Sequence, residues 1–131
     1  MASLSPIEMI QRNADLVIQS TYQQFGVTLS YDEESVEWLD DHIEELREKN
    51  YSQDDINMLI NVLGSFYGEC IRQQYGGEWT DYRGAYMVRL ENGQLVSPFS
   101  KVMKQFESGV SQSVRLYFDT IPQLTRKGDT P

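Results

Sequence analysis

The stretch SQDDINMLINVLGSFYGECIRQQYGG, residues 52–77, contains the longest apolar stripe of the chain. Ser52 is a typical N-cap residue, and Asp55 stands three positions later, as in a capping box. Gly76 and Gly77 end the pattern, because glycine tolerates the left-handed backbone of helix C-termini. We therefore predict a central helix between these signals. Its apolar residues keep helical spacing: Ile56, Leu59, Ile60, Leu63, Tyr67 and Ile71.

Two further helices are predicted before this stretch. Ser5 and Pro6 form a plausible N-cap and first turn, and Gly26 ends the apolar periodicity that follows. Asp32 opens a second segment that keeps helical spacing up to Asn50. The apolar positions of this second helix are Val36, Leu39, Ile43 and Leu46.

After Gly77 the period of the sequence changes to that of strands. Asn92-Gly93 is a strong hairpin signal between two β-forming runs. We predict an α+β domain with three N-terminal helices, a two- or three-stranded antiparallel sheet and two C-terminal helices, the last ending at Pro122. The predicted strands are 78–83, 85–90 and 95–99, the last helices are 99–109 and 110–122, and a single domain of residues 1–124 is followed by a flexible tail, 125–131.

Charge is unevenly distributed along the chain. Residues 1–55 carry 13 acidic and 3 basic residues, whereas residues 56–131 carry 7 and 8. Such a field repels nucleic acid and anionic membrane surfaces and favours basic protein partners. With one cysteine, one histidine and no signal-peptide or transmembrane pattern, we expect a cytoplasmic protein without a disulfide framework, metal or cofactor.

Several motifs resemble those of a known family. The run LGSFYGECIRQQYGGEW (63–79) contains LG-x-x-x-GE and GG-x-W, and PFSKV (98–102) and GVSQS (109–113) follow the hairpin. This pattern is similar to that of a family of small bacterial proteins of unknown function, frequent in cyanobacteria. The resemblance spans nearly the whole chain and implies a bacterial cytoplasmic origin. It does not indicate any particular activity.

The second predicted helix is unusually acidic. Like-charge pairs at i,i+4 along it each destabilise an isolated helix by roughly 0.2–0.5 kcal/mol. The helix is then either a solvated face, a surface for a basic partner with Trp38 as a partly exposed anchor, or a divalent-cation site, and the last is disfavoured because no EF-hand loop pattern is present. The candidate partner-binding residues are Glu37, Trp38, Asp41, Glu44 and Glu45.

A second candidate site is a pocket between the central helix and the hairpin. Gly64 and Gly68 inside the helix each cost ~1 kcal/mol relative to alanine, which indicates close packing or room for a ligand. We favour close packing. The residues that would line such a pocket are Gly64, Gly68, Glu69, Arg72, Trp79 and Tyr82.

No catalytic group of residues emerges from the sequence. His42 lies among acidic residues that should favour its protonated form, which suits an ion pair better than a general base. Cys70 falls in the apolar stripe, where a buried thiol is usual. We therefore expect a non-enzymatic adaptor, inhibitor or regulatory module, with a small-molecule-binding or enzymatic domain as the alternative and homo-oligomerisation as a further possibility.

Overall fold

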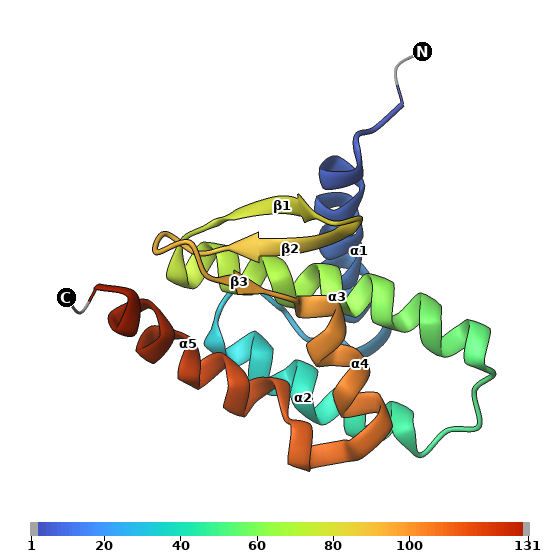
Figure 1. Ribbon diagram of the computed structural model, residues 1–131. Coiled ribbons are helices and arrows are strands. Elements are labelled where there is room, and N and C mark those ends of the chain that lie inside the picture. Colours follow the sequence, from blue (N-terminus) through green and yellow to red (C-terminus); the bar gives the residue numbers. More distant parts are fainter. Residues whose placement is uncertain (1–2, 130–131) are drawn as a thin grey trace.

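The computed structural model describes residues 3–129, and over these residues the α+β class is confirmed. Helix α3 occupies the centre, with the sheet on one side and α2 and α5 on the other (Figure 1). None of the helices in this range is long and apolar enough to cross a membrane. The elements are α1 (Pro6–Phe25), α2 (Glu33–Arg47), α3 (Gln53–Tyr75), β1 (Glu78–Tyr82), β2 (Ala85–Arg89), β3 (Leu95–Val96), α4 (Pro98–Ser108), a 3-10 turn (Gly109–Gln112) and α5 (Val114–Asp129).

The first three helices begin where the capping signals predict. The side chains of Ser5, Asp32 and Ser52 each accept a hydrogen bond from a backbone N–H three residues later. Glu8 completes a capping box by accepting the Ser5 N–H at 2.9 Å. Gly26 ends α1 with φ of +68°, a left-handed conformation that suits glycine.

The sheet has the order β1-β2-β3 and is antiparallel throughout. β1 and β2 are joined by the two-residue turn Arg83-Gly84, in which both residues have positive φ. The predicted third strand is too long, because Ser97 caps α4 and Pro98 occupies its first turn. The returning strand is therefore reduced to Leu95–Val96.

Close packing explains both helical glycines of α3. A Cβ added at Gly64 would lie 2.5 Å from the Phe99 ring, and one at Gly68 would lie 2.1 Å from the Trp79 ring. The sheet and α4 thus approach the bare helix backbone directly. Next to this ridge α3 contributes the fully buried core residues Phe66, Tyr67, Cys70 and Ile71.

The C-terminal region differs from the prediction in two ways. Residues 109–112 form a 3-10 turn, so α5 begins at Val114 rather than at 110, and the Tyr67 hydroxyl donates to the Val114 carbonyl at 2.6 Å. Pro122 does not end α5, which continues through it to Asp129 although an interior proline removes one hydrogen bond and crowds the preceding turn. Residues 125–129 of the predicted tail therefore extend α5, while 130–131 lie outside the described residues.

Candidate functional site

The residues beside the buried stripe of α2 fall into two groups that differ in their contacts. We call Glu37, Asp40 and Glu44 the inner flank, because they contact α4 and α5. We call Trp38, Asp41, His42 and Glu45 the outer flank. By the 3.6-residue period Trp38 and His42 lie on the side away from the inner flank, whereas Asp41 and Glu45 lie between the two sides, opposite the buried stripe.

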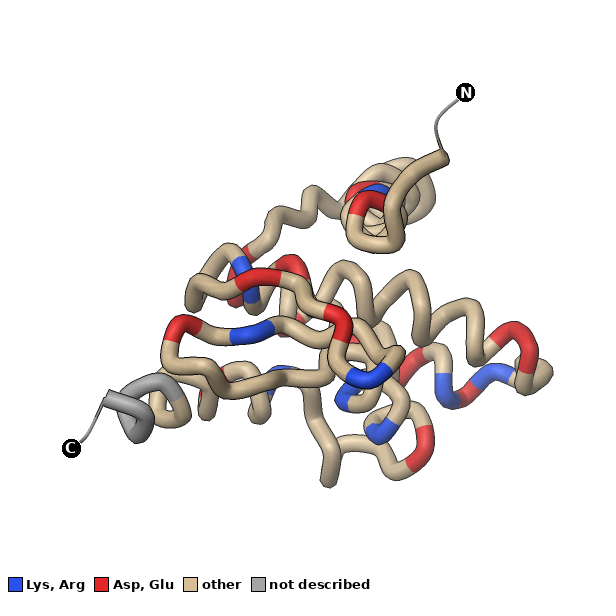
Figure 2. The backbone as a smooth tube through the Cα atoms, turned by 45° about the horizontal axis from the view of Figure 1, so that its top comes forward, with Lys and Arg blue, Asp and Glu red and all other residues tan. Residues whose placement is uncertain are grey.

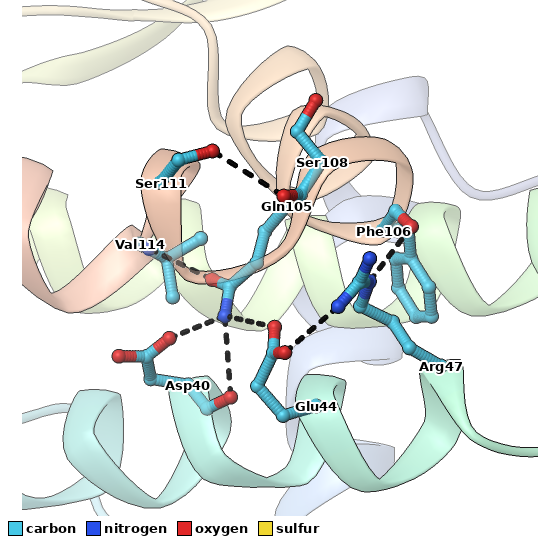
Figure 3. Close-up of polar contacts among 8 residues, drawn as sticks. All are labelled: Asp40, Glu44, Arg47, Gln105, Phe106, Ser108, Ser111 and Val114. Carbon is cyan, nitrogen blue, oxygen red and sulfur yellow. Dashed lines mark hydrogen bonds and ion pairs between the residues drawn. The ribbon is translucent and has the colours of Figure 1, made fainter.

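Gln105 joins the inner flank to the C-terminal helices (Figure 3). Its side chain is fully buried, and its amide nitrogen donates to Asp40 and, at 3.0 Å, to Glu44 Oε2. Its amide oxygen accepts the Val114 N–H at 2.8 Å, and Ser113 Oγ donates to the second carboxylate oxygen of Asp40 at 2.7 Å. These carboxylates therefore form internal structural bonds.

Two arginines complete the inner flank. Arg47 pairs with Glu44 at 2.9 Å and donates from Nε to the Phe106 carbonyl at 3.1 Å. Arg115 of α5 pairs with Glu37 at 2.8 Å on the surface. Glu37 and Glu44, both predicted as partner-binding residues, thus have partners within the chain.

The outer flank carries an aromatic cluster formed by Phe25, Trp38 and His42. The Trp38 and His42 rings are stacked, with centroids 4.5 Å apart and planes 19° from parallel. Phe25, at the end of α1, meets the His42 ring edge-on at 5.8 Å and remains 55% exposed. Such arrangements of aromatic rings contribute about 0.5–1.5 kcal/mol each beyond buried area.

The environment of His42 corrects the sequence-based expectation. Burial in the aromatic cluster lowers the pKa of the imidazole, although the nearby Glu45 carboxylate acts in the opposite direction. The neutral form is therefore favoured relative to a free histidine. The sequence showed the acidic neighbours but not the rings of Trp38 and Phe25.

Asp41 and Glu45 differ from the acids of the inner flank. Both are exposed, and neither carboxylate forms a hydrogen bond or ion pair with another described residue. Acidic positions also lie on other elements, with basic positions among them (Figure 2). Negative charge alone therefore does not distinguish the outer flank, which also carries the aromatic cluster of Phe25, Trp38 and His42. Phe25 was missed, because only the fold brings the end of α1 to α2.

The second predicted site contains an ion pair between the buried Glu69 and the half-buried Arg72. Arg72 binds the Glu69 carboxylate through Nε at 2.9 Å and Nη2 at 3.0 Å, and the Trp79 indole N–H donates to the same carboxylate at 2.7 Å. Burial would raise the pKa of Glu69, but the bonds from Arg72 and Trp79 outweigh it and lower the pKa. The carboxylate is thus charged and satisfied by hydrogen bonds.

The other residues of this predicted pocket lie apart from that ion pair or are covered. The surfaces of Gly64 and Gly68 are filled by Phe99, Trp79 and Pro98, so the interpretation of these glycines as a ligand floor is wrong. Tyr82 is exposed at the end of β1 beside Arg83. An open depression of about 270 Å³ does adjoin Arg72 and Trp79, but its other wall is α1, through Ile7 and Gln11.

The remaining titratable candidates show no catalytic arrangement in the described part of the chain. Cys70 is fully buried, and burial raises the pKa of its thiol, which disfavours the nucleophilic thiolate. No group of three or more His, Cys, Asp or Glu side chains between residues 3 and 129 is placed to hold a metal ion. No protein-family model, curated protein or solved structure matches the chain, so the family resemblance stays a prediction.

Proposed function

We propose that this chain is a non-enzymatic protein-interaction module that contacts a basic protein through the outer flank of α2. The observation that carries the proposal is the combination of the aromatic cluster, in which Phe25 is exposed and Trp38 half-buried, with two carboxylates that have no partner among the described residues. Aromatic side chains are the common anchors of protein interfaces, and unpaired charges beside them steer and select a partner of opposite sign.

The inner flank narrows the proposed surface. Glu37 and Glu44 are bound to Arg115, Arg47 and Gln105, so their charges are already compensated. Reversing them would damage the docking of α2 rather than report on a partner. The proposed contact residues are therefore Trp38, Asp41 and Glu45, together with Phe25.

The test uses a charge-reversal variant that leaves the inner flank intact. The tagged protein is used to capture proteins from a bacterial lysate at low salt, and a basic protein that elutes as salt rises is then produced and its affinity measured. We expect Asp41→Lys/Glu45→Lys to weaken this affinity at least tenfold, because the new charges repel a basic surface.

A matched control separates the proposed surface from net charge. Glu107→Lys/Asp119→Lys makes the same change in net charge at exposed positions of α4 and α5. We expect this control to change the affinity less than threefold. If the two double variants bind every captured protein equally well, the proposal is wrong.

The small-molecule alternative ranks second. Its support among the described residues is two open depressions: one of about 270 Å³ beside Arg72 and Trp79, and one of about 300 Å³ where Asn61, Tyr86 and Phe99 meet α1. Both lie at or below the lower end of the ~300–1,000 Å³ of typical ligand pockets.

A further inference from the structure

A hollow of about 140 Å³ lies beneath the aromatic cluster, where α1, α2 and α3 meet. Its apolar walls come from all three helices. Two of the wall side chains, Leu16 and Phe25, are 42% and 55% exposed although they stand beside an unfilled apolar space. The apolar lining residues are Leu16, Val17, Phe25, Trp38, Val62 and Leu63.

The size of the hollow matches one apolar side chain. An apolar protein cavity of ~150 Å³ is large enough to hold benzene and stays free of water. This hollow opens to the surface, and its lining also includes Ser20, Thr21, Gln24 and His42. Its volume of about 140 Å³ is that of an aliphatic side chain of leucine, isoleucine or methionine size, which can keep a polar neighbour at the opening. Burying such a group removes apolar surface from water on both partners.

Two carboxylates one helical turn beyond the lining rings indicate which charge accompanies that side chain. Asp41 follows Trp38 by three positions in α2, and Glu45 follows His42 by three, so each carboxylate lies on the helix surface next to a ring of the hollow. Both are exposed and unpaired among the described residues. A cation that enters with the aliphatic group thus meets these two carboxylates, while Lys49 near His42 is the opposing charge.

We infer that the hollow accepts an aliphatic side chain of the basic partner, and that the recognised segment carries Lys or Arg next to this anchor. This inference rests on the proposed function and adds the chemistry of the bound segment to it. Asp41 and Glu45 select the positive charge, while Trp38 and Phe25 enclose the anchor. Electrostatic steering and apolar burial then act at the same point of the surface.

The test uses small probes that reproduce the two parts of such a segment. Isopentylammonium combines a branched aliphatic group with a cation; isopentanol lacks the charge, isovalerate reverses it, and ethylammonium lacks most of the aliphatic group. Binding is followed by NMR through the two indole N–H signals. Trp38 reports on the hollow, and Trp79, which donates to Glu69, serves as the internal reference.

We expect isopentylammonium to shift the Trp38 signal and not the Trp79 signal. Ethylammonium and isovalerate should bind at least tenfold more weakly than isopentylammonium. The affinity of isopentanol should lie between that of isopentylammonium and that of these two probes. A Trp38 signal that responds equally to all four probes, or to none of them, overturns the inference.

Two exposed positions of α1 provide matched variants. Ser20 lines the hollow, whereas Gln19 points to the other side of the helix, so Ser20→Leu fills the space and Gln19→Leu does not. We expect Ser20→Leu to abolish the response to isopentylammonium and Gln19→Leu to preserve it. An unchanged response in Ser20→Leu contradicts the inference.

The same variants separate this inference from the proposed function. If Asp41→Lys/Glu45→Lys weakens binding of a captured partner while Ser20→Leu leaves it unchanged, the interaction module stands and the hollow is not its anchor site. The remaining possible occupant of the hollow is a second copy of this chain. Analytical ultracentrifugation of the protein alone shows whether it dimerises. A dimer that Ser20→Leu dissociates would place a second copy in the hollow and overturn the inference.

Discussion

The two tryptophans stand in contrasting surroundings. Trp79 is 6% exposed, lies against Gly68 and donates its N–H to Glu69 at 2.7 Å. Trp38 is partly exposed and is held by stacking on His42, with centroids 4.5 Å apart. A buried ring fixed by packing and a hydrogen bond supports the fold, whereas a partly exposed ring at the edge of the core keeps surface available to a partner.

The largest effect on stability is expected at Trp79. Trp79→Ala should lower the free energy of unfolding by about 3–5 kcal/mol, because it leaves a cavity in the core. It also removes one hydrogen bond from the buried Glu69 carboxylate. Urea unfolding measures the loss, with Tyr82→Ala at the exposed end of β1 as a control that should cost less than about 1 kcal/mol. An equal loss of unfolding free energy in Trp79→Ala and Tyr82→Ala would show that Trp79 does not support the fold in the way proposed.

A smaller loss is expected from Gly68→Ala, because its Cβ would lie 2.1 Å from the Trp79 ring. Overpacking of this kind costs about 1–3 kcal/mol, of which the better helix propensity of alanine offsets about 1 kcal/mol. In the Trp79→Ala background the same substitution should become stabilising. A double-mutant cycle by urea unfolding tests the coupling, and strictly additive effects would show that the ring does not constrain Gly68.

Trp38→Ala should cost about 1–2 kcal/mol of stability, because it removes two ring contacts and part of the packing at the edge of the core. Its effect should instead appear in binding, with at least a tenfold loss of affinity for a partner captured at the outer flank. Calorimetric titration and urea unfolding of one preparation give both numbers. A stability loss as large as that of Trp79→Ala would assign Trp38 to the core.

The smallest effect concerns the pH dependence of His42. Its pKa is lowered by burial from the ordinary 6.5, so the unfolded chain binds a proton more readily than the folded one. The free energy of unfolding therefore decreases as the pH falls from about 6.5 through the lower folded-state pKa. We expect His42→Gln to lose less stability than the parent protein over this interval, measured by urea unfolding at matched pH values. Parallel curves would show that burial of the ring does not affect its titration.

Local signals predicted much of the fold. Ser5, Asp32 and Ser52 as caps and Gly26 as a stop set helix ends correctly, since these bonds span only a few residues. The course of the chain at Pro122 was not predicted, because a proline inside a helical pattern usually ends or kinks the helix, whereas α5 continues through it.

The candidate site was less accessible to sequence reasoning. All five predicted residues of α2 lie outside its buried stripe. Whether a carboxylate among them is paired depends on residues far away in the sequence. Glu44 meets Gln105 across 61 positions, and Glu37 meets Arg115. Local sequence signals do not reveal such pairings, and the meeting of Phe25 with Trp38 and His42 is of the same kind.

The Gln105 network also bears on the order in which the chain folds. Gln105 bonds to Asp40 across 65 positions and to Val114 nine positions later. Closing such a loop costs chain entropy before any contact compensates for it. During synthesis, α2 emerges long before Gln105 exists, so Asp40 and Glu44 stay hydrated until the last quarter of the chain is made. The packing of α2 against the C-terminal helices is therefore a late step in folding, completed when the Gln105 side chain forms its hydrogen bonds.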